Sequence, residues 1–500
     1  MTTESAEARW SVSFDTVTQM FCDALQAAPE TLYCKGSAGE LSYAQAAGAM
    51  QGLAQQLGTE VAGRTVALVL PNSTAFLIAY FGVLFAGARP ALVNYGHPDG
   101  TIDKLLAGLD VATVLSDREI AGIQTTHFND VAAHQLANAI DPDALQSVAK
   151  SDDIGAILFS GGTTGLPKQV AHSNTVLANK VERMEWGWPT NPNEIWLPVA
   201  PFTHVYGFLM GVLNPVLRAG SIIIPPRFQP DLIVDMLSKE NVTIFGGGPP
   251  AIYQGIMSSG KFTDTAFPAL RVCPGGGAPF PLAVHRRWEQ ATGLPITEGY
   301  GMTEIAPISV NTESDGMKPG AAGKPVPDTV IEIVDIQTGQ QVMPDGESGE
   351  IRVKGPHMMT GYAGNPEETA LTLRNGFVYT GDIGSIDTDG FLTISDRKKD
   401  VIFVKGFNVF PREIEEVLLN HPAVSGACVV GREDERAGEL PLAFVTLKES
   451  TNAADILSFC RECLTDYKVP AEVLILESLP LTPAGKVDRL NLKNRQNAKH

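Results

Sequence analysis

The chain has 500 residues, 44% of them hydrophobic, which is ample for a large core and too long for one ordinary compact domain. It carries 37 Lys and Arg against 56 Asp and Glu, a formal charge of −19. This balance argues against a broad cationic face for nucleic acid or anionic lipid, so any phosphate-binding site must be local.

The N-terminal sequence MTTESAEARW has no basic segment followed by an apolar one, so no secretory signal is predicted. The longest apolar run starts at Ala75, is interrupted by Gly82 and Gly87 and ends at Arg89, too short to span a bilayer. Six scattered cysteines do not form a disulfide framework. We expect a cytoplasmic monomer or homodimer with no membrane span and no nucleic-acid partner.

Strand-like and helix-like segments alternate through the first part of the chain. Strands are predicted at 65–70, 89–94 and 111–116, and after Asp153 at 154–160, 194–200, 221–226, 242–248, 270–277 and 294–301. Helical segments between them, such as 230–241, give the rhythm of parallel sheets covered by helices. The sequence therefore predicts an α/β fold whose large N-terminal body contains two parallel-type sheet lobes.

The pattern changes near Thr329, where period-two runs joined by Asp-Gly and Gly-Glu turns predict a small antiparallel β-barrel. After residue 400, a helix at 411–420, strands at 425–431 and 442–447 and a helix at 453–464 predict a small, mobile α+β domain. We place the N-terminal domain at 1–396, a hinge at 397–400 and a C-terminal lid domain at 401–500.

A glycine-rich loop, SGGTTGLPK, begins at Ser160 directly after a predicted strand. Its bare backbone amides and hydroxyls suit phosphate oxygens, and Lys168 can neutralise charge. It is not a Walker loop, because no Gly-Lys pair is followed by Ser or Thr where that motif requires it. Taken alone, such a loop is a simple turn about as often as a phosphate site.

Five further motifs follow in order: GGGAP at 275–279, YGMTE at 300–304, YTGD at 379–382, DRKKD at 396–400 and PAGK at 483–486. Together with the loop they resemble the adenylate-forming superfamily of acyl-CoA synthetases, peptide synthetase adenylation domains and beetle luciferases. The resemblance spans 41–486. It implies ATP-dependent adenylation of a carboxylic acid, release of pyrophosphate, and transfer of the acyl group to the thiol of coenzyme A.

The resemblance implies a set of ATP- and AMP-binding residues. They are Ser160, Gly161, Gly162, Thr163, Thr164, Gly165, Lys168, Gly276, Gly277, Ala278, Pro279, Tyr300, Gly301, Met302, Thr303, Asp382, Ile394, Arg397 and Lys486. Within it, Thr303 would bond the α-phosphate and Glu304 would hold Mg²⁺, a hard oxygen ligand for a hard ion. Outside such a motif, a Thr-Glu pair like Thr303 and Glu304 would instead predict a helix cap.

Asp382 has the chemistry to accept hydrogen bonds from two ribose hydroxyls, and Arg397 would reach the same sugar. As alternatives without a role in binding, Asp382 could end a turn and Arg397 could form a surface ion pair. By resemblance, Lys486 bridges the acyl carboxylate and the α-phosphate, although a lysine near a chain end is usually solvated.

The same resemblance makes Lys399 the hinge about which the small domain rotates between the two half-reactions. Gly406 and Phe407 would then line the tunnel for coenzyme A.

His204, in PFTHVYG, matches a gate between the acid pocket and the thiol entrance, with a buried histidine bonded to backbone as its rival. The acid pocket is assigned to His204, Gly246, Gly247, Gly248, Gly275 and Gly299. Glycines in VTIFGGG predict a roomy, apolar pocket for a bulky acid, or else only a tight strand-to-helix turn. No arginine precedes YGMTE to pair a second carboxylate, which argues against a small dicarboxylate.

The predicted catalytic residues are Lys486, Thr303, Glu304 and His204, and the predicted function is an acid–thiol ligase using ATP, Mg²⁺ and coenzyme A. Two alternatives stay open: an acyl-AMP ligase that loads an acyl carrier protein, and a nucleotide-binding regulator that has lost catalysis. The compact stretch between YGMTE and YTGD favours coenzyme A over the carrier protein.

Overall fold

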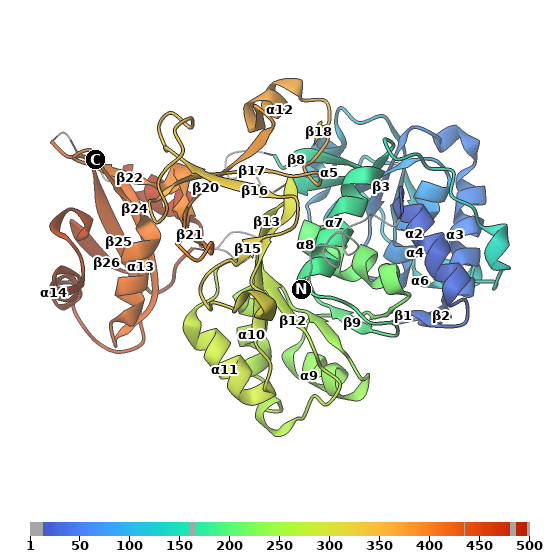
Figure 1. Ribbon diagram of the computed structural model, residues 1–500, viewed down its shortest axis with the longest axis horizontal. Coiled ribbons are helices and arrows are strands. Elements are labelled where there is room, and N and C mark those ends of the chain that lie inside the picture. Colours follow the sequence, from blue (N-terminus) through green and yellow to red (C-terminus); the bar gives the residue numbers. More distant parts are fainter. Residues whose placement is uncertain (1–13, 161–165, 435, 481–486, 498–500) are drawn as a thin grey trace. The chain divides into compact units, whose positions relative to one another are not determined.

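The computed structural model describes residues 14–160, 166–434, 436–480 and 487–497 (Figure 1). The chain divides into two compact units. One comprises Met1–Ile331, Val353–Tyr379 and Gly390–Leu392, and the other comprises Glu332–Arg352, Thr380–Asp389 and Thr393–His500. The expected limits at residues 396 and 400 stay predictions.

The first unit contains a seven-stranded sheet in the order β18-β8-β7-β4-β3-β5-β6. Its strands are β3 (Thr65–Val69), β4 (Arg89–Leu92), β5 (Val111–Ser116), β6 (Thr125–His127), β7 (Ile154–Ser160), β8 (Lys168–Ser173) and β18 (Gly361–Tyr362). β3 to β7 run parallel and β8 returns antiparallel to β7, with Ser160 opposite Lys168. The glycine-rich loop therefore joins these two strands.

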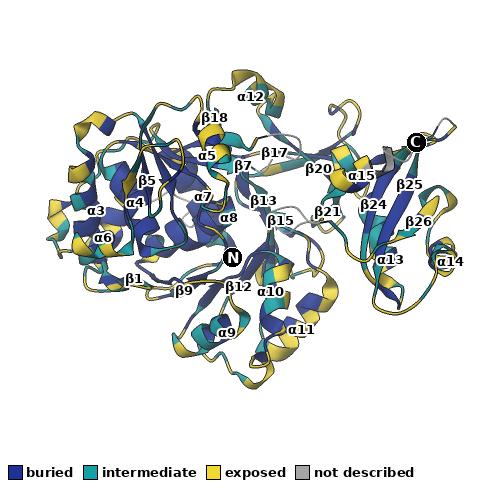
Figure 2. Cartoon of the chain, turned by 180° about the vertical axis from the view of Figure 1, so that it is seen from behind, coloured by how far each residue is buried: buried dark blue, intermediate teal, exposed yellow. Residues whose placement is uncertain are grey.

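Helices flank these strands along the chain, and α4, α7 and α12 contact the sheet directly. The helices are α3 (Tyr43–Leu57), α4 (Thr74–Phe85), α5 (Asp99–Leu106), α6 (Asp130–Gln135), α7 (Asn174–Gly187) and α12 (Pro366–Thr372). Ser42 and Gln45 form a capping box that starts α3. α4, from the longest apolar run of the sequence, is buried over nearly all its length and belongs to the dark blue interior in Figure 2. Among the residues that the structure describes, no helix has both the length and the apolar character to cross a membrane.

A second sheet of the first unit has the order β11-β9-β10-β1-β2. Its strands are β1 (Leu32–Gly36), β2 (Gly39–Ser42), β9 (Ile195–Pro198), β10 (Ser221–Ile223) and β11 (Ile244–Gly246). Only β2 is antiparallel to its neighbour. Further helices of the first unit are α2 (Val17–Ala27), α8 (Val205–Phe208), α9 (Pro230–Lys239) and α10 (Pro250–Met257).

The third sheet of the unit has the order β12-β13-β14-β15 and carries two of the motifs. Its strands are β12 (Cys273–Gly276), β13 (Ile296–Met302), β14 (Ile305–Val310) and β15 (Lys324–Pro325), with α11 (Leu282–Thr292) between β12 and β13. β12 and β13 are parallel, whereas β13 and β14 form a tight hairpin. An aromatic cluster around Trp288 of α11 packs beneath this region.

Two further sheets follow. One has the order β16-β17-β20-β19 with β21 beside β20, and its strands are β16 (Val330–Val334), β17 (Gly349–Lys354), β19 (Leu373–Arg374), β20 (Phe377–Ile386) and β21 (Leu392–Arg397). The other has the order β23-β22-β25-β24 with β26 beside β25, and its strands are β22 (Ile402–Val404), β23 (Phe407–Val409), β24 (Val424–Asp434), β25 (Gly438–Leu447) and β26 (Glu472–Ile475).

Three helices complete the second unit: α13 (Pro411–Asn420), α14 (Ala453–Cys463) and α15 (Arg489–Asn497). Ile414 and Leu418 of α13 share a core with strand residues such as Val429 and Val445. The predicted fold class is confirmed: two largely parallel sheets with helices, an antiparallel sheet and a small C-terminal α+β part.

Candidate active site

Three glycine-rich segments lie against one another at the ends of β11, β12 and β13. The backbone N–H of Gly276 donates to the carbonyl of Gly248 at 3.1 Å. A side-chain carbon added at Gly276 would lie 2.7 Å from the carbonyl oxygen of Gly299, so only glycine permits this approach. The structure thus brings together the GGGAP segment, the pocket-wall glycines and the residues before YGMTE.

The two interpretations of the glycines after β11 can now be compared. A side-chain carbon at Gly247 would lie 2.6 Å from the ring of Tyr253 and 2.7 Å from the ring of Phe245, and Gly248 has φ +95°. Aromatic packing and a left-handed turn therefore account for these two glycines.

The YGMTE motif forms the end of the β13–β14 hairpin. Met302 pairs with Ile305, so Thr303 and Glu304 occupy the turn between the two strands. The Glu304 residue is only 5% exposed, and its Oε1 accepts a 2.7 Å hydrogen bond from the Tyr362 hydroxyl. Burial and the neighbouring carboxylate raise the pKa of Tyr362, which keeps its hydroxyl a donor.

Lys168, at the start of β8, lies near the tyrosine that bonds Glu304. Its ammonium group lies 5.0 Å from the centre of the Tyr362 ring and pairs with Glu368. Ser160 stands opposite Lys168 across the β7–β8 pair. Gly161, Gly162, Thr163, Thr164 and Gly165 lie outside the described residues, so their predicted phosphate contacts stay predictions.

A buried basic group that sequence reasoning missed lies beneath the hairpin. Lys180 of α7 is 0% exposed, and its Nζ donates to the carbonyl of Ala306 at 3.5 Å. Burial lowers the pKa of Lys180 to about 7, while the charge of Glu304 acts in the opposite direction. Burial and the charge of Lys180 also hold the pKa values of His172 and His357 well below the usual range.

One sequence signal could have found Lys180. Lys180 is spaced three and four residues from Leu177, Val176 and Met184, so it interrupts the apolar stripe of a helix. A lysine at such a position is buried only with a partner. Tyr362, in contrast, stands in a short strand with no pattern of its own.

His204 is exposed and caps α8, where its Nδ1 accepts from the N–H of Tyr206 at 3.2 Å. The rival interpretation, a buried histidine, is therefore wrong in its burial, although the bond to backbone is present. The Tyr206 ring would lie 3.5 Å and 3.9 Å from side-chain carbons added at Gly248 and Gly276. His204 thus sits two residues from an aromatic ring that covers the glycine segments.

The second unit holds the predicted ribose residues. Nε of Arg397 lies 2.7 Å from Oδ1 of Asp382, whose side chain is 6% exposed against 58% for Arg397. Asp382 also donates its N–H to the hydroxyl of Thr380 at 3.0 Å. The two predicted partners of one sugar are therefore bonded to each other.

The remaining predicted residues of this unit lie on strands β21 and β23 and in the turns beside them. Ile394 accepts from Arg412 through its carbonyl at 3.1 Å, and Lys399 is exposed in the 3₁₀ turn Lys398–Asp400. Gly406 has φ +85° in the β22–β23 turn, and Phe407 stacks on Tyr467 with ring centres 4.6 Å apart. Lys486 lies outside the described residues.

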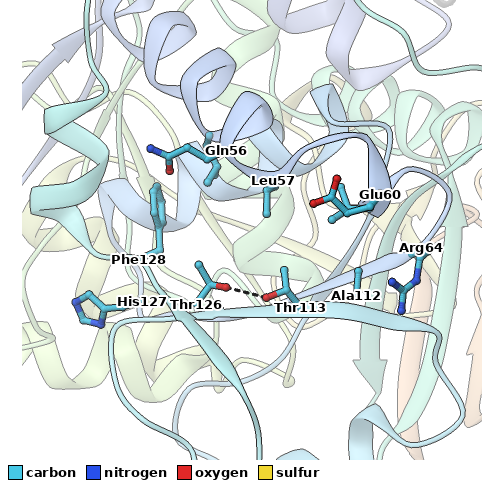
Figure 3. A pocket seen from close by; sticks show the side chains of 11 residues that line it. Gln56, Leu57, Glu60, Arg64, Ala112, Thr113, Thr126, His127 and Phe128 are labelled. Atoms are coloured by element: carbon cyan, nitrogen blue, oxygen red, sulfur yellow. Dashed lines mark hydrogen bonds between the residues drawn. The ribbon is translucent and has the colours of Figure 1, made fainter.

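A cavity of about 260 Å³ lies elsewhere in the first unit, beside β5 and β6 (Figure 3). Its lining is mixed, with the apolar Leu57 and Phe128 beside polar side chains, and the hydroxyls of Thr113 and Thr126 share a 2.9 Å hydrogen bond. It contains no residue of the six motifs. The candidate site is therefore defined by the strand ends and the hairpin.

Comparison with known proteins shows the family of this chain. The family model of the AMP-binding enzymes matches residues 22–363, and the model of the AMP-binding enzyme C-terminal domain matches residues 413–486. A long-chain-fatty-acid–CoA ligase of Bacillus subtilis is 34% identical over 88% of this chain and 86% of its own. A 4-coumarate–CoA ligase of Vanilla planifolia is 33% identical over 87% of this chain and 84% of its own.

Among solved structures, the o-succinylbenzoate CoA synthetase of Bacillus subtilis in complex with its acyl-adenylate intermediate superposes with a TM-score of 0.84. The two are 26% identical, and the match covers 95% of this chain and 97% of the other. The chain therefore belongs to the AMP-binding enzymes and, within that family, is an AMP-forming acyl-CoA synthetase.

Proposed function

We propose that this enzyme converts a bulky, largely apolar carboxylic acid to its acyl-adenylate on the β13–β14 hairpin and then passes the acyl group to coenzyme A. The observation that carries the proposal is the hairpin turn, where Thr303 and the buried Glu304 stand beside backbone that only glycine can form. A hydroxyl, a carboxylate and open backbone amides are the groups that a reacting α-phosphate and its metal require.

The chemistry of Glu304 suits Mg²⁺. Its carboxylate is fixed by the Tyr362 hydroxyl, and one or two carboxylates with substrate phosphates are the usual protein ligands of this ion. Among the described residues no cluster of three or more His, Cys, Asp or Glu side chains is arranged around a common point, so a dedicated cage for a transition metal is not what these residues build. When bound, Mg²⁺ would neutralise charge on the phosphate oxygens.

The other residues act by binding and orienting. Thr303 donates its hydroxyl to the α-phosphate, Lys168 offers its ammonium group to the outer phosphates, and Asp382 accepts from the ribose hydroxyls. The attacking carboxylate is already ionised at neutral pH, so His204 need not move a proton. Lys486 holds the acyl carboxylate against the α-phosphate, which converts the attack into a positioned, effectively unimolecular step.

The second half-reaction needs a thiol where Lys486 stood. We assign the domain limits to 1–396 and 401–500, with rotation at Lys399 within the hinge 397–400. Gly406 and Phe407 then line the path of coenzyme A. The exposed ring of Phe407, the first residue of β23, supports this assignment, because 55% of the surface of this residue is open to contact.

A bulky acid is supported by the relatives and by the apolar side chains around the hairpin. The names of the relatives given above refer to a long-chain fatty acid, 4-coumarate and o-succinylbenzoate, which are all large acids with apolar or aromatic parts. Near Gly299 a side-chain carbon would meet the ring of Trp188 at 3.7 Å. Aromatic and apolar walls of this kind suit such acids.

The test is a screen for acid-dependent pyrophosphate release across aliphatic, aromatic and polycyclic acids, with product analysis in the presence of coenzyme A and of an acyl carrier protein. We expect release with large apolar acids, and a thioester with coenzyme A. A panel in which no acid elicits pyrophosphate would sink the proposal, and a product found only on the carrier protein would replace its second step.

A further inference from the structure

We propose that Asn72 is a positioning residue for the acid-binding side of the site: its side chain fixes the backbone of residues 200–204, the loop that carries His204. The inference rests on the proposed function, with His204 in the acid pocket. Asn72 belongs to none of the six motifs, and it follows β3, a strand of a different sheet from β9, which leads into the loop.

The side-chain amide of Asn72 bonds the loop at two points. Its Nδ2 donates to the carbonyl of Ala200 at 2.8 Å, and its Oδ1 accepts from the N–H of Phe202 at 2.8 Å. An amide offers a donor and an acceptor together, so one side chain satisfies both backbone groups at once. The loop is therefore held on both sides of Pro201.

Asn72 itself stands on a rigid base. It precedes Ser73, whose side chain accepts from the N–H of Phe76 at 3.1 Å and starts α4. α4 is buried over nearly all its length, and the ring of Phe76 packs edge to face on that of Phe202 with centres 5.5 Å apart. The loop is thus tied to the start of α4 by a polar contact and by an apolar one.

The two joined segments leave their sheets at the edges where ligands usually bind. Asn72 follows β3 and the loop follows β9, and in open α/β sheets ligands lie beyond the carboxyl ends of parallel strands. In the first sheet only β4 separates β3 from β7, and β7 leads into the glycine-rich loop. In the second sheet β9 pairs with β11, which leads into the pocket glycines. Asn72 therefore joins the edges of the two sheets at the candidate site.

A shift of the loop would reach the acid pocket directly. A side-chain carbon at Gly207 of α8 would lie 2.1 Å from the carbonyl oxygen of Pro201, so the start of this helix rests on the loop backbone. His204 caps α8, and the Tyr206 ring would lie 3.5 Å from a carbon added at Gly248. The bonds of Asn72 therefore act on the side of the site that is assigned to the acid.

The first test asks whether Asn72 fixes the loop. Asn72→Ala removes both bonds, and hydrogen–deuterium exchange is measured on the ligand-free, full-length enzyme. We expect faster exchange in the peptide that covers residues 199–208 and unchanged exchange in a peptide that covers the β13–β14 hairpin. Unchanged exchange at 199–208 would overturn the inference and leave the proposed function untouched.

The second test asks whether the fixed loop positions the acid. Acid-dependent pyrophosphate release is measured with hexadecanoate, 4-coumarate and cholate as aliphatic, aromatic and polycyclic probes. For each accepted acid we expect the KM of the acid to rise about tenfold in Asn72→Ala, and the KM of ATP to change less than about twofold. Equal rises in both constants, or an unchanged KM of the acid, would overturn the positioning role. If the unchanged enzyme releases no pyrophosphate with any of the three acids, the proposed function fails, and the inference fails with it.

Asn311 provides a matched control in the same unit. Its Nδ2 donates to the carbonyl of Lys318 at 2.7 Å, and its Oδ1 accepts from the N–H of the same residue at 2.9 Å. Asn311→Ala therefore removes the same two kinds of bond from another loop. Because Asn311 is fully buried, we expect this change to lower the Tm at least as much as Asn72→Ala, and to leave the ratio of the two KM values unchanged. A shifted ratio in the control would mean that lost stability alone suffices, which contradicts a specific role of Asn72.

A double-mutant cycle tests whether Asn72 acts through the loop that carries His204. We expect His204→Ala to raise the KM of the acid, and the double variant to raise it by much less than the two single effects combined. Fully additive effects would mean that Asn72 acts on the acid by another route, which overturns the inference. An unchanged KM in His204→Ala would remove His204 from the acid pocket, and the inference would lose its premise while adenylation itself stays proposed. If Asn72→Ala does not fold, Asn72→Asp, which keeps an acceptor for the N–H of Phe202, takes its place with the same expected outcomes.

Discussion

The two carboxylates assigned to the nucleotide, Glu304 in the first unit and Asp382 in the second, are held in different ways. Both residues are nearly buried, at 5% and 4% exposure. Glu304 is bonded by the hydroxyl of Tyr362, a buried residue of the short strand β18, and this partner cannot leave without disturbing the core. Asp382 is bonded by Arg397, whose side chain is 58% exposed and free to swing. The difference predicts a preformed metal ligand and a sugar ligand that exchanges its partner when the nucleotide binds.

The largest effect is expected from Lys486→Ala, which tests whether the second unit contributes to one half-reaction only. Without this ammonium group the acyl carboxylate is no longer held against the α-phosphate, so the rate of acid-dependent pyrophosphate release should fall about 10³-fold. Thioester formation from a preformed acyl-adenylate should largely survive, measured as thioester formed per minute. Equal loss of both steps would remove Lys486 from the adenylation step.

The next largest effect is expected from Asp382→Asn, which tests the role of Asp382 as the ribose ligand. An amide accepts the ribose hydroxyls poorly and no longer pairs with Arg397, so the Kd of AMP and the KM of ATP should both rise about 10²-fold. The change should not depend on magnesium concentration. The control is Asp389→Asn, an exposed aspartate in a turn of the same unit, which should leave both constants unchanged. A rise confined to magnesium–ATP would contradict a ribose role.

A smaller effect, a rise of about tenfold in the Kd of magnesium–ATP, is expected from Tyr362→Phe, which tests the role of Glu304 as the metal ligand. Loss of the 2.7 Å bond frees the Glu304 carboxylate, so the Kd of magnesium–ATP should rise while the Kd of AMP in EDTA stays the same. Tyr253→Phe is the matched control, because it removes another buried hydroxyl, one that donates to the carbonyl of Pro274 at 2.7 Å. If both variants weaken magnesium–ATP binding equally, the effect is one of stability and not of the carboxylate.

The comparison also shows how far sequence could reach. The alternation of strands and helices and the Asp-Gly turns predicted the fold class, because periodicity records which face of each element is buried. The motifs predict roles for Thr303 and Glu304, yet the side chain that bonds Glu304 comes from Tyr362, 58 positions away. Such partners are set by tertiary packing, and a single chain offers no local pattern for them.

The glycines after β11 form a visible sequence pattern that fits two structural explanations. The sequence left open whether they widen the acid pocket or permit a turn, since either use requires only a missing side chain. The answer for Gly247 depends on the rings of Phe245 and Tyr253, which fill the space that a side chain would need.

The smallest effect is expected from Gly299→Ala, which tests whether the acid binds in the first unit, beside the β13–β14 hairpin. The added carbon would lie 3.4 Å from the carbonyl oxygen of Ser309 and 3.7 Å from the Trp188 ring, so the fold should accept it. Because the acid is proposed to lie along the same wall, kcat/KM for the bulkiest accepted acid should fall about 3- to 10-fold relative to a shorter one, with the KM of ATP unchanged. Gly276→Ala makes the contrast, since its carbon would lie 2.7 Å from the carbonyl of Gly299 and must displace backbone. It should reduce turnover of every acid alike, and a Gly299→Ala enzyme that did the same would place the acid away from this wall.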